Sequence, residues 1–466
     1  MEKEEATEKA QDLIRMSVAR SSLLEPLQES YLPVNKAALV IGGGVAGMTC
    51  ALLIAAQGHE VFLLERDREL GGMARRIYYT LEGMDVQAYL SDLVKKVYRH
   101  PMLHVHTGAV INKVSGYVGN FTTNITSEKG YHEIRHGAAV IAVGAEQYRP
   151  SEYLYGEDER VMTNLELEGR IAAGEEKIIG ARTLVMIQCV GCRNEERNYC
   201  SRVCCSGSVK NALKLKDLNP EMDIYILFRD MRTYGFREDY YREASVRDIK
   251  FIRYEAEEKP QVEATHEDGR PVLRVTAIDY ILGRKLAVDA DFVCLAAAVV
   301  PSGSAREIAG LYKLSLGPDS FFQEAHVKLR PVDCAAEGVY LCGTAHYPKH
   351  IAETVSQAYG AAGRALTLLS HDTVVASGSV CDVDEKRCIG CGTCIPACRY
   401  GAIGFQDTRQ GRKAVVNPVL CKGDGLCNAK CPTGAIYLKH YRDEQILRQI
   451  DAMFSEQWIA DEEEIG

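Results

Sequence analysis

The sequence lacks an apolar run of the roughly 20 residues that a transmembrane helix requires, so we expect no membrane span. It also lacks an excess of positive charge, because its formal net charge is −9 and an acidic run stands at residues 461–464. This balance argues against nucleic acid or an anionic membrane as the main partner. Residues 1–5 do not have the pattern of a signal peptide, and we expect a cytoplasmic protein.

A glycine turn is also missing at a position where one would be informative. The apolar segment 183–187 predicts a strand, and the segment 208–215 predicts a helix. In a flavoprotein with two dinucleotide-binding domains, glycines between such a strand and helix hold the pyrophosphate of NAD(P). Here the turn carries five cysteines instead: Cys189, Cys192, Cys200, Cys204 and Cys205.

The first turn of this kind is intact. The apolar segment 38–41 predicts a buried parallel strand, and it leads through a GxGxxG pattern into a predicted helix at 48–56. Gly42 makes the tight turn, Gly44 lets the backbone approach a phosphate, and Gly47 allows close packing of helix and strand. The pyrophosphate is expected at the N-terminus of the helix.

The residues after this turn resemble the FAD half of flavoproteins of the glutathione and thioredoxin reductase type. A predicted strand at 61–64 ends at Glu65, which is placed to bind the ribose hydroxyls of the adenosine, and the glycine pair 71–72 follows. The strand ending at Gly144, its later echo at 291–296, and the strand before Gly343 resemble further parts of the same domain.

The resemblance implies a set of FAD contacts. Thr344 stands where most relatives have an aspartate that binds the ribityl chain. The helix near Glu353 would direct its N-terminal N–H groups at the flavin pyrimidine, where they stabilise negative charge. The implied contacts are Gly42, Gly44, Val45, Ala46, Gly47, Glu65, Arg66, Gly72, Met73, Val143, Gly144, Gly343, Thr344, Glu353, Thr354 and Val355.

The 17 cysteines are too many for packing alone in an intracellular protein, so they indicate metal ligands rather than disulfides. Near the C-terminus a C-x2-C-x2-C-x3-C pattern of the bacterial ferredoxin kind occurs, and a second copy follows at an offset of 33 residues. The fourth cysteine of each copy is expected to bind the other cluster. One 4Fe–4S cluster is therefore assigned to Cys388, Cys391, Cys394 and Cys431, and the other to Cys421, Cys427 and Cys398.

The second copy departs from the pattern at Asp424, which stands where the second cysteine belongs. Four alternatives are open. Asp424 supplies a carboxylate ligand, or one iron is left to water, or the cluster has only three irons, or Cys381 substitutes through space. The first three keep Cys381 as a bystander.

The cysteines between residues 189 and 205 also allow more than one interpretation. Cysteine is often a small buried apolar residue, which is the interpretation for Cys50, Cys294, Cys334 and Cys342. The vicinal pair at 204–205 could form a redox disulfide. A dithiol reductase would normally keep its nicotinamide site, however, and this turn has lost its glycines. A metal cluster is the better account.

The segments around this turn resemble the A subunit of heterodisulfide reductase and its relatives. The similarity covers nearly the whole chain, and it lies in the segments 6–20, 188–191, 199–205, 210–213, 229–235, 348–351 and 353–358. It implies that Cys189, Cys200, Cys204 and Cys205 hold a cluster beside the flavin. Cys192 falls where many relatives have serine and is left out. Lys210 matches a family lysine near the flavin, where a cation would favour the reduced, anionic form.

The resemblance is to a compact form of the family. Longer relatives carry an N-terminal cluster domain and a ferredoxin domain inserted after the glycine pair 71–72, and neither is expected here. Compact forms occur in complexes that couple hydrogenases, formate dehydrogenases or other reductases to low-potential carriers. The expected partners are redox subunits of these kinds or like the B and C subunits of heterodisulfide reductase, and ferredoxin is a further candidate. A homodimer within such a larger anaerobic complex is expected.

The predicted fold class is α/β, a flavoprotein with two dinucleotide-binding domains followed by an α+β ferredoxin domain with two clusters. The expected organisation is a helical arm at 1–35, FAD-binding segments at 36–150 and 291–375, a degenerate NAD(P)-type domain carrying a cluster at 151–290, the ferredoxin domain at 376–440, and an acidic amphipathic helix and tail at 441–466.

The predicted function is that of an oxidoreductase subunit that contains FAD and three iron–sulfur sites. It takes electrons from a donor delivered by a partner and relays or splits them, with bifurcation as one form of the reaction. The alternatives are a stand-alone NAD(P)H-dependent flavin oxidoreductase, a thiol–disulfide reductase, and an assembly subunit with a vestigial flavin.

Overall fold

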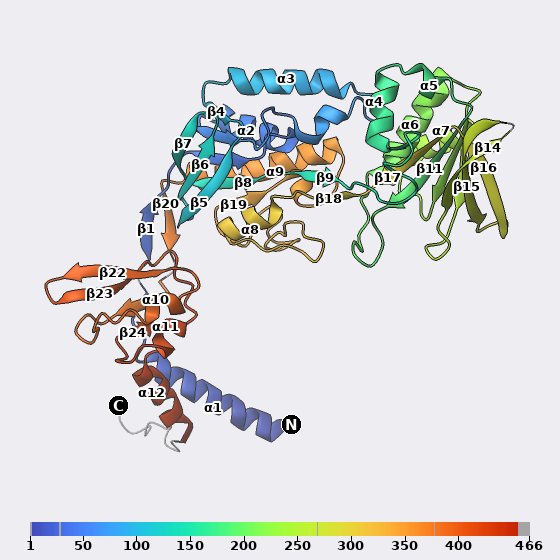
Figure 1. Ribbon diagram of the computed structural model, residues 1–466. Helices are drawn as coiled ribbons and strands as arrows, with labels where there is room; N and C mark the ends of the chain where they lie inside the picture. The colour runs from blue at the N-terminus through green and yellow to red at the C-terminus, as the bar shows by residue number, and fades with distance from the viewer. Residues whose placement is uncertain (1, 28, 268, 377, 455–466) are drawn as a thin grey trace. The chain divides into compact units, whose positions relative to one another are not determined.

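The computed structural model describes residues 2–27, 29–267, 269–376 and 378–454. It divides into two compact units, Val34–His371 and Met1–Pro33 together with Asp372–Gly466, and each is described by itself (Figure 1). Among the helices in these described ranges, none has the length and apolar character to cross a membrane.

The larger unit contains a first sheet of parallel strands in the order β19-β8-β2-β3-β4. The strands are β2 (Ala38–Ile41), β3 (Val61–Leu64), β4 (Leu103–His106), β8 (Ala138–Ile141) and β19 (Val339–Leu341). Val40 pairs with Leu63 on one side and Val140 on the other. A parallel strand covered on both faces is apolar throughout, which explains the continuous apolar run in β2.

Helices cover one face of this sheet and an antiparallel meander covers the other (Figure 1). The helices are α2 (Val45–Ala56), α3 (Val86–Arg99) and α9 (Ile351–Ser370). The opposite face packs against β5 (Val110–Tyr117), β6 (Asn120–Ser127), β7 (Gly130–His136) and α8 (Ala305–Tyr312). Along β2, Val40 faces the helices, whereas Leu39 and Ile41 face the meander. The short helix η1 (Gly72–Arg76) lies between β3 and α3, and η3 (Gly343–Ala345) follows β19.

The same architecture occurs a second time, in the order β10-β17-β11-β12-β13. These parallel strands are β10 (Val161–Thr163), β11 (Thr183–Val190), β12 (Asp223–Phe228), β13 (Lys250–Arg253) and β17 (Phe292–Ala297). One face packs against α4 (Asn164–Ala172), α5 (Glu176–Ile179), α6 (Cys204–Leu218) and α7 (Glu238–Val246), which η2 (Gly235–Arg237) precedes. The other packs against β15 (Arg270–Asp279) and β16 (Arg284–Ala290), with β14 (Gln261–Glu267) beside them.

The predicted domain boundary at residue 291 is wrong. Strand β17 lies between β10 and β11, so it belongs to the second sheet and not to the returning FAD segment. The sequence similarity between the segments of β8 and β17 has a structural basis, because β17 occupies in the second sheet the position that β8 occupies in the first. The chain passes between the domains through β9 (Ala145–Gln147) and β18 (Val299–Pro301), which pair antiparallel.

The smaller unit combines the ends of the chain. β1 (Ser30–Pro33) pairs antiparallel with β20 (Thr373–Ala376). The following segment forms two antiparallel pairs and two short helices: β21 (Cys381–Val383) with β24 (Ile436–Leu438), β22 (Ile403–Thr408) with β23 (Gly411–Val416), α10 (Cys394–Ala397) and α11 (Leu426–Ala429).

The terminal helices of the smaller unit pack against each other. They are α1 (Lys3–Ser21) and α12 (Asp443–Phe454). The Arg20 guanidinium donates to the main-chain oxygen of His440 (2.6 Å), and the Gln445 amide donates to that of Leu23 (2.9 Å). The predicted C-terminal amphipathic helix is therefore present and packs on the chain itself. The acidic run 461–464 lies outside the described residues.

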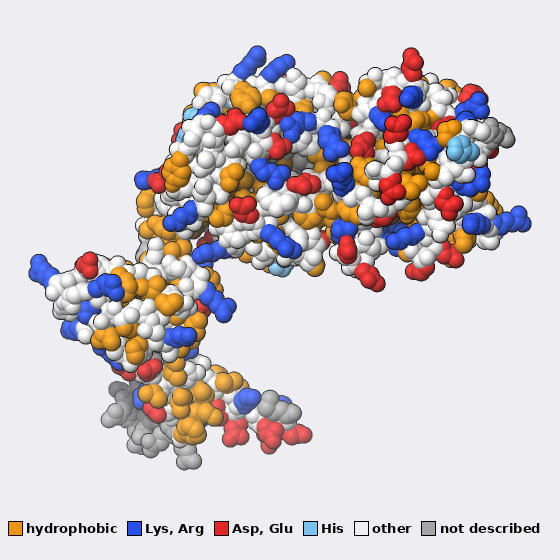
Figure 2. All heavy atoms as spheres, in the orientation of Figure 1, with side chains coloured by type: hydrophobic (Ala, Val, Ile, Leu, Met, Phe, Trp, Pro, Cys, Tyr) orange, Lys and Arg blue, Asp and Glu red, His pale blue; other side chains and the backbone are white. Residues whose placement is uncertain are grey.

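Charged side chains of both signs are interspersed on the visible face of the larger unit (Figure 2). The formal net charge of −9 is therefore not gathered into one acidic patch on that face.

Candidate functional site

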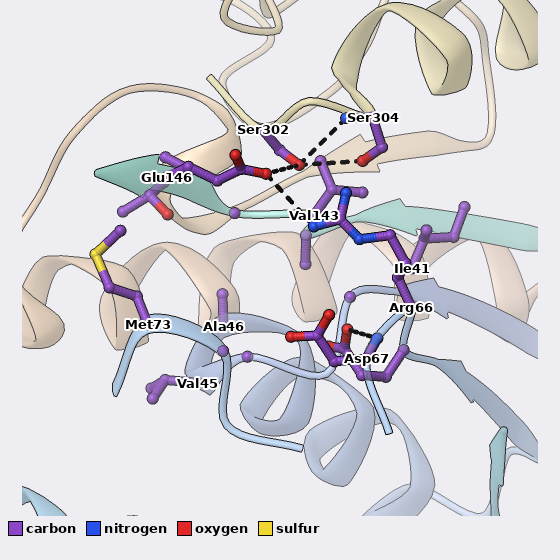
Figure 3. Close-up of a pocket in the computed structure, with 18 of the residues that line it drawn as sticks. Ile41, Val45, Ala46, Arg66, Asp67, Met73, Val143, Glu146, Ser302 and Ser304 are labelled. Atoms are coloured by element: carbon purple, nitrogen blue, oxygen red, sulfur yellow. Dashed lines mark hydrogen bonds and ion pairs between the residues drawn. The ribbon is translucent and has the colours of Figure 1, made fainter. Parts of the chain in front are cut away.

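A cavity of about 490 Å³ opens at the carboxyl ends of the strands of the first sheet (Figure 3). Ligands of parallel α/β sheets bind at this edge. Met73 of η1 and Arg66, which follows β3, border the cavity at different places, and Ser302 and Ser304 border it from the chain before α8. Twelve of the residues predicted to contact FAD line it: Gly42, Gly44, Val45, Ala46, Glu65, Arg66, Gly72, Met73, Val143, Gly144, Thr344 and Thr354.

The β2–α2 turn has the backbone that a pyrophosphate needs. Gly42 has φ +113°, and a Cβ there would lie 2.2 Å from the main-chain oxygen of Ala142. A Cβ at Gly47 would lie 1.8 Å from the oxygen of Gly42, so helix and strand approach closely. A Cβ at Gly44 would meet nothing within 4 Å, and the first N–H bonded within α2 is that of Met48, to Gly44 (2.9 Å). The free N–H groups of the first turn fit an anionic ligand.

Glu65 is fixed at the end of β3. One carboxylate oxygen accepts the N–H of Gly43 (2.7 Å), and the other accepts that of Asp67 (2.8 Å). A carboxylate has about four acceptor sites, so it can still accept ribose hydroxyls. The neighbouring Arg66 forms an ion pair with Glu146 (3.4 Å). The donor and acceptor set around the cavity therefore fits FAD.

Four predicted contacts do not line the cavity: Gly47, Gly343, Glu353 and Val355. The glycines serve packing, since a Cβ at Gly343 would lie 2.6 Å from the Cβ of Ala46. The Glu353 carboxylate accepts the N–H of His350 (2.9 Å), which caps α9, and it pairs with Arg202 (2.9 Å). The arginine and the helix start hold the pKa of Glu353 below its usual value against the opposing effect of burial.

Lys349 also lines the cavity, although its position in the sequence did not identify it as a site residue. It stands two residues before α9, is only 6% exposed, and donates to the main-chain oxygens of Gly343 and Tyr347. Burial lowers the pKa of Lys349 to about 7. In the sequence, this lysine stands between the last predicted FAD strand and the following helix, which is the one feature that could have pointed to it. Its burial depends on the tertiary fold and could not be predicted from the sequence.

Lys210 lies elsewhere. Its ammonium group donates to Glu168 (2.7 Å) and to the main-chain oxygen of Tyr79 (2.8 Å), and it is not among the residues that line the cavity. Burial lowers the pKa of Lys210, and the carboxylate of Glu168 opposes that shift. The ion pair carries no net charge, which differs from the expected cation beside the flavin.

The cysteine-rich turn of the second dinucleotide domain connects β11 with α6. Cys189 has φ +63°, in the left-handed region, which redirects the chain at the end of β11. Cys192, Cys204 and Cys205 are 3%, 6% and 2% exposed, and the last two form the first turn of α6. Cys200 is partly exposed, and its sulfur accepts the N–H of Arg202 (3.3 Å).

The thiols of this turn influence one another. A hydrogen bond from Cys192 lowers the pKa of Cys189 to about 6, and Arg193, whose guanidinium lies 3.8 Å from the sulfur, favours the thiolate further. A hydrogen bond from Cys204 lowers the pKa of Cys205. The structure thus brings Cys189 and Cys205 together with Cys192, which sequence reasoning had left out.

The cysteines of this turn have the chemistry that a cluster requires. Each cysteine ligand of an iron–sulfur cluster attaches to a separate iron atom as a thiolate. Cys189 and Cys205, whose pKa values are lowered, fit that requirement directly. The same hydrogen bonds raise the pKa values of their partners Cys192 and Cys204.

The ferredoxin-like segment contains a small cavity of about 20 Å³. The four cysteines predicted for the first cluster, Cys388, Cys391, Cys394 and Cys431, all line it. The sulfur of Cys388 accepts the N–H of Ala414 (3.4 Å), and that of Cys431 accepts the N–H of Ala435 (3.2 Å). N–H bonds to sulfur are a feature that tunes cluster potentials, so this donor set fits a 4Fe–4S cluster.

Comparison with known proteins finds two matching family models and several relatives. Family models match at residues 387–435 (4Fe-4S dicluster domain) and 40–97 (NAD(P)-binding Rossmann-like domain). The A subunit of the H2:CoB-CoM heterodisulfide, ferredoxin reductase of Methanothermobacter thermautotrophicus is 34% identical over 97% of this chain and 82% of that protein. The second iron-sulfur A subunit of the CoB–CoM heterodisulfide reductase of Methanopyrus kandleri is 34% identical over 96% and 82%. The chain belongs to the family of heterodisulfide reductase A subunits.

Its family members are named as reductases, and the chain is an oxidoreductase subunit. The alignment with the M. thermautotrophicus relative spans 547 residues and exceeds the 466 of this chain, so that relative has additional residues within the aligned region. A difference in this direction is what a compact form predicts.

Solved structures also resemble the chain. The thioredoxin reductase of T. acidophilum covers 72% of this chain and 97% of its own, with 15% identity and a TM-score of 0.48. The enzyme of Lactococcus lactis covers 72% and 98%, with 17% identity and a TM-score of 0.49. The two sheets of like topology and the matched dicluster domain confirm the predicted fold class.

Proposed function

We propose that the protein is a cytoplasmic electron-transfer subunit with FAD and three iron–sulfur clusters, within a complex like heterodisulfide reductase. Its partners are redox subunits such as the B and C subunits of heterodisulfide reductase, or hydrogenase, formate dehydrogenase or other reductase modules. Ferredoxin is a further candidate partner, and the protein forms a homodimer within the complex. Whether the electrons are relayed or split by bifurcation depends on these partners.

The contrast between the two dinucleotide turns carries the proposal. The β2–α2 turn passes from strand to helix through residues 42–44, and its helix N-terminus borders the large cavity. The β11–α6 connection runs through residues 191–203, and buried Cys204 and Cys205 occupy the first turn of its helix. One turn is thus suited to a dinucleotide and the other to a cluster.

The residues around the first cavity would hold FAD through its phosphates and ribose. The N–H groups at the start of α2 bind the pyrophosphate, and Glu65 binds the adenosine ribose. Thr344 and the first residues of α9 also line the cavity, and they would contact the flavin ring. When bound, FAD supplies the exchange between paired and single electrons, which the clusters require.

The proposal is tested on anaerobically purified full-length protein by its visible spectrum, its FAD content and its iron content. We expect one FAD and about twelve irons per chain if all three clusters are cubanes, or about eleven if one has three irons. Protein without flavin that is otherwise folded would contradict the function.

We expect NADH and NADPH not to reduce the bound FAD of the isolated chain at a catalytic rate. A nicotinamide dinucleotide needs a glycine turn and free N–H groups at a second helix N-terminus. At Gly191 the backbone is pressed against Tyr148, since a Cβ there would lie 2.1 Å from its ring, and buried cysteines begin α6. The measurement is the loss of flavin absorbance after mixing with either nucleotide under anaerobic conditions.

Dithionite serves as the control, because it must reduce the same sample fully. Rapid bleaching by NADH or NADPH without partner subunits would contradict the prediction and would favour a stand-alone NAD(P)H oxidoreductase.

A further inference from the structure

The second ferredoxin-like motif lacks one thiolate, because Asp424 stands at the offset of 33 residues from Cys391. The Asp424 carboxylate is exposed and accepts the N–H of Leu426 (3.3 Å). Cys391 is exposed as well, so exposure does not separate the two as ligands. A further thiol, that of Cys381, lies beside the remaining cysteines of this motif.

Cys381 lies against the two remaining cysteines that begin this motif. It is 3% exposed, and its sulfur lies 3.5 Å from that of Cys427. Its main-chain N–H donates to the sulfur of Cys421 (3.4 Å). A cysteine seven residues before the first motif has therefore become part of the second site.

Strand pairing explains how Cys381 reaches this place. Beside the first cluster site, Phe405 on β22 pairs with Ala414 on β23. Beside the second cluster site, Leu438 on β24 pairs with Cys381 on β21. The same offset of 33 residues relates Phe405 to Leu438 and Cys381 to Ala414. Cys381 therefore occupies, at the second cluster site, the position that Ala414 occupies at the first.

Ala414 shows what this position faces. Its side chain lines the cavity of the first cluster with Cys388, Cys391, Cys394 and Cys431. Its N–H bonds to Cys388 (3.4 Å), just as the N–H of Cys381 bonds to Cys421 (3.4 Å). The methyl group of Ala414 thus faces the first cluster site. The thiol of Cys381 stands at the equivalent point of the second cluster site, whose motif lacks one cysteine.

We propose that Cys381 is the fourth thiolate ligand of the second cluster, with Cys398, Cys421 and Cys427, in place of Asp424. This inference rests on the proposed cluster content. Thiolate is the soft ligand that iron–sulfur clusters select, whereas a carboxylate is harder. The second site is then an all-cysteine 4Fe–4S site, and Asp424 is a surface residue of its loop.

The loop of the second motif is built to lie against this strand. Gly423 has φ +66°, and a Cβ there would lie 2.9 Å from the main-chain oxygen of Ser379. The segment leading to Cys381 thus packs on the loop that carries Cys421.

The test compares Cys381→Ala with Asp424→Asn in the full chain, purified anaerobically. Alanine already stands at the equivalent position 414, so the first variant should fold. We expect Cys381→Ala to lose about one iron and to show the electron paramagnetic resonance signal of a three-iron cluster without exposure to air. Asp424→Asn should keep the parent iron content and show no such signal. Cys334→Ala, a buried cysteine of the larger unit, is the matched control and should behave like the parent.

A rescue variant separates loss of a ligand from loss of structure. Cys381→Ala combined with Asp424→Cys returns the thiolate to its usual place, and we expect it to regain the fourth iron. Full iron content in Cys381→Ala, or a three-iron signal in Asp424→Asn alone, would overturn the proposal. Unmodified protein that holds FAD but no ferredoxin-type cluster would instead refute the proposed function on which the inference rests.

Discussion

Replacing Cys204 and Cys205 by serine is expected to remove one whole cluster and to leave FAD bound. Both cysteines are buried at the start of α6, and the hydroxyl of serine is a harder and weaker ligand for cluster iron than a thiolate. The FAD cavity is lined from the other dinucleotide domain, at the β2–α2 turn. Iron should fall from about twelve to about eight per chain. The measurements are iron, sulfide and FAD contents of protein prepared without oxygen.

Cys294→Ser is the matched control for this double variant. Cys294 is a fully buried cysteine of the same domain, on β17, where its thiol donates to the side chain of Asn164 (3.0 Å). The Cys294→Ser variant should retain all the iron. Cys192→Ser should also retain it if Cys189 and Cys200 complete the ligand set. An unchanged iron content in the double variant, or only the two ferredoxin clusters in unmodified protein, would refute the assignment.

Local sequence patterns were sufficient for the turns and the strands that flank them. The apolar segment 38–41 is β2, and the glycines after it have the close contacts that their spacing predicts. A parallel strand and a phosphate-binding turn are encoded within about ten residues, so they can be read without knowledge of the fold. The doubled cysteine spacing is local in the same way, and the matched dicluster domain at 387–435 covers most of it.

Pairings between distant residues could not be predicted from the sequence. Lys210 is neutralised by Glu168 from α4, and nothing local indicates that partner. Cys381 reaches Cys427 only because β21 pairs with β24. The boundary at residue 291 was misplaced for a related reason, since an apolar strand does not reveal which of two similar sheets it joins.

Lys349 is expected to raise the reduction potential of the bound flavin, and to do so most strongly at low pH. Its ammonium group is buried in the wall of the cavity, close to the N-terminus of α9. A cation there favours negative charge on the reduced ring, as the helix N-terminus does. In a site of low polarity such an effect is larger than in water.

The sign of the pH dependence follows from the lowered pKa of Lys349, about 7. Below that pH the lysine is protonated before and after flavin reduction, and its full charge acts. Negative charge on the reduced flavin raises the pKa of Lys349, so above pH 7 reduction is accompanied by uptake of a proton. The contribution of Lys349 to the reduction potential then falls by about 30 mV per pH unit. This follows because 30 mV for two electrons and one pKa unit both equal about 1.4 kcal/mol.

Each unit by which flavin reduction raises the pKa of Lys349 corresponds to about 30 mV of two-electron potential. Lys349→Met should therefore lower the potential at pH 6 by at least that amount per unit, and by less at pH 9. Lys349→Arg keeps the charge at every pH, so it should keep a high potential and lose the added pH dependence. Lys216→Met removes another buried lysine, which bonds to Pro220 in the second dinucleotide domain, and should leave the potential unchanged. Spectroelectrochemical titrations between these pH values measure all four proteins. Parallel curves for the parent and Lys349→Met would show that Lys349 stays in one protonation state on reduction, which would contradict this account.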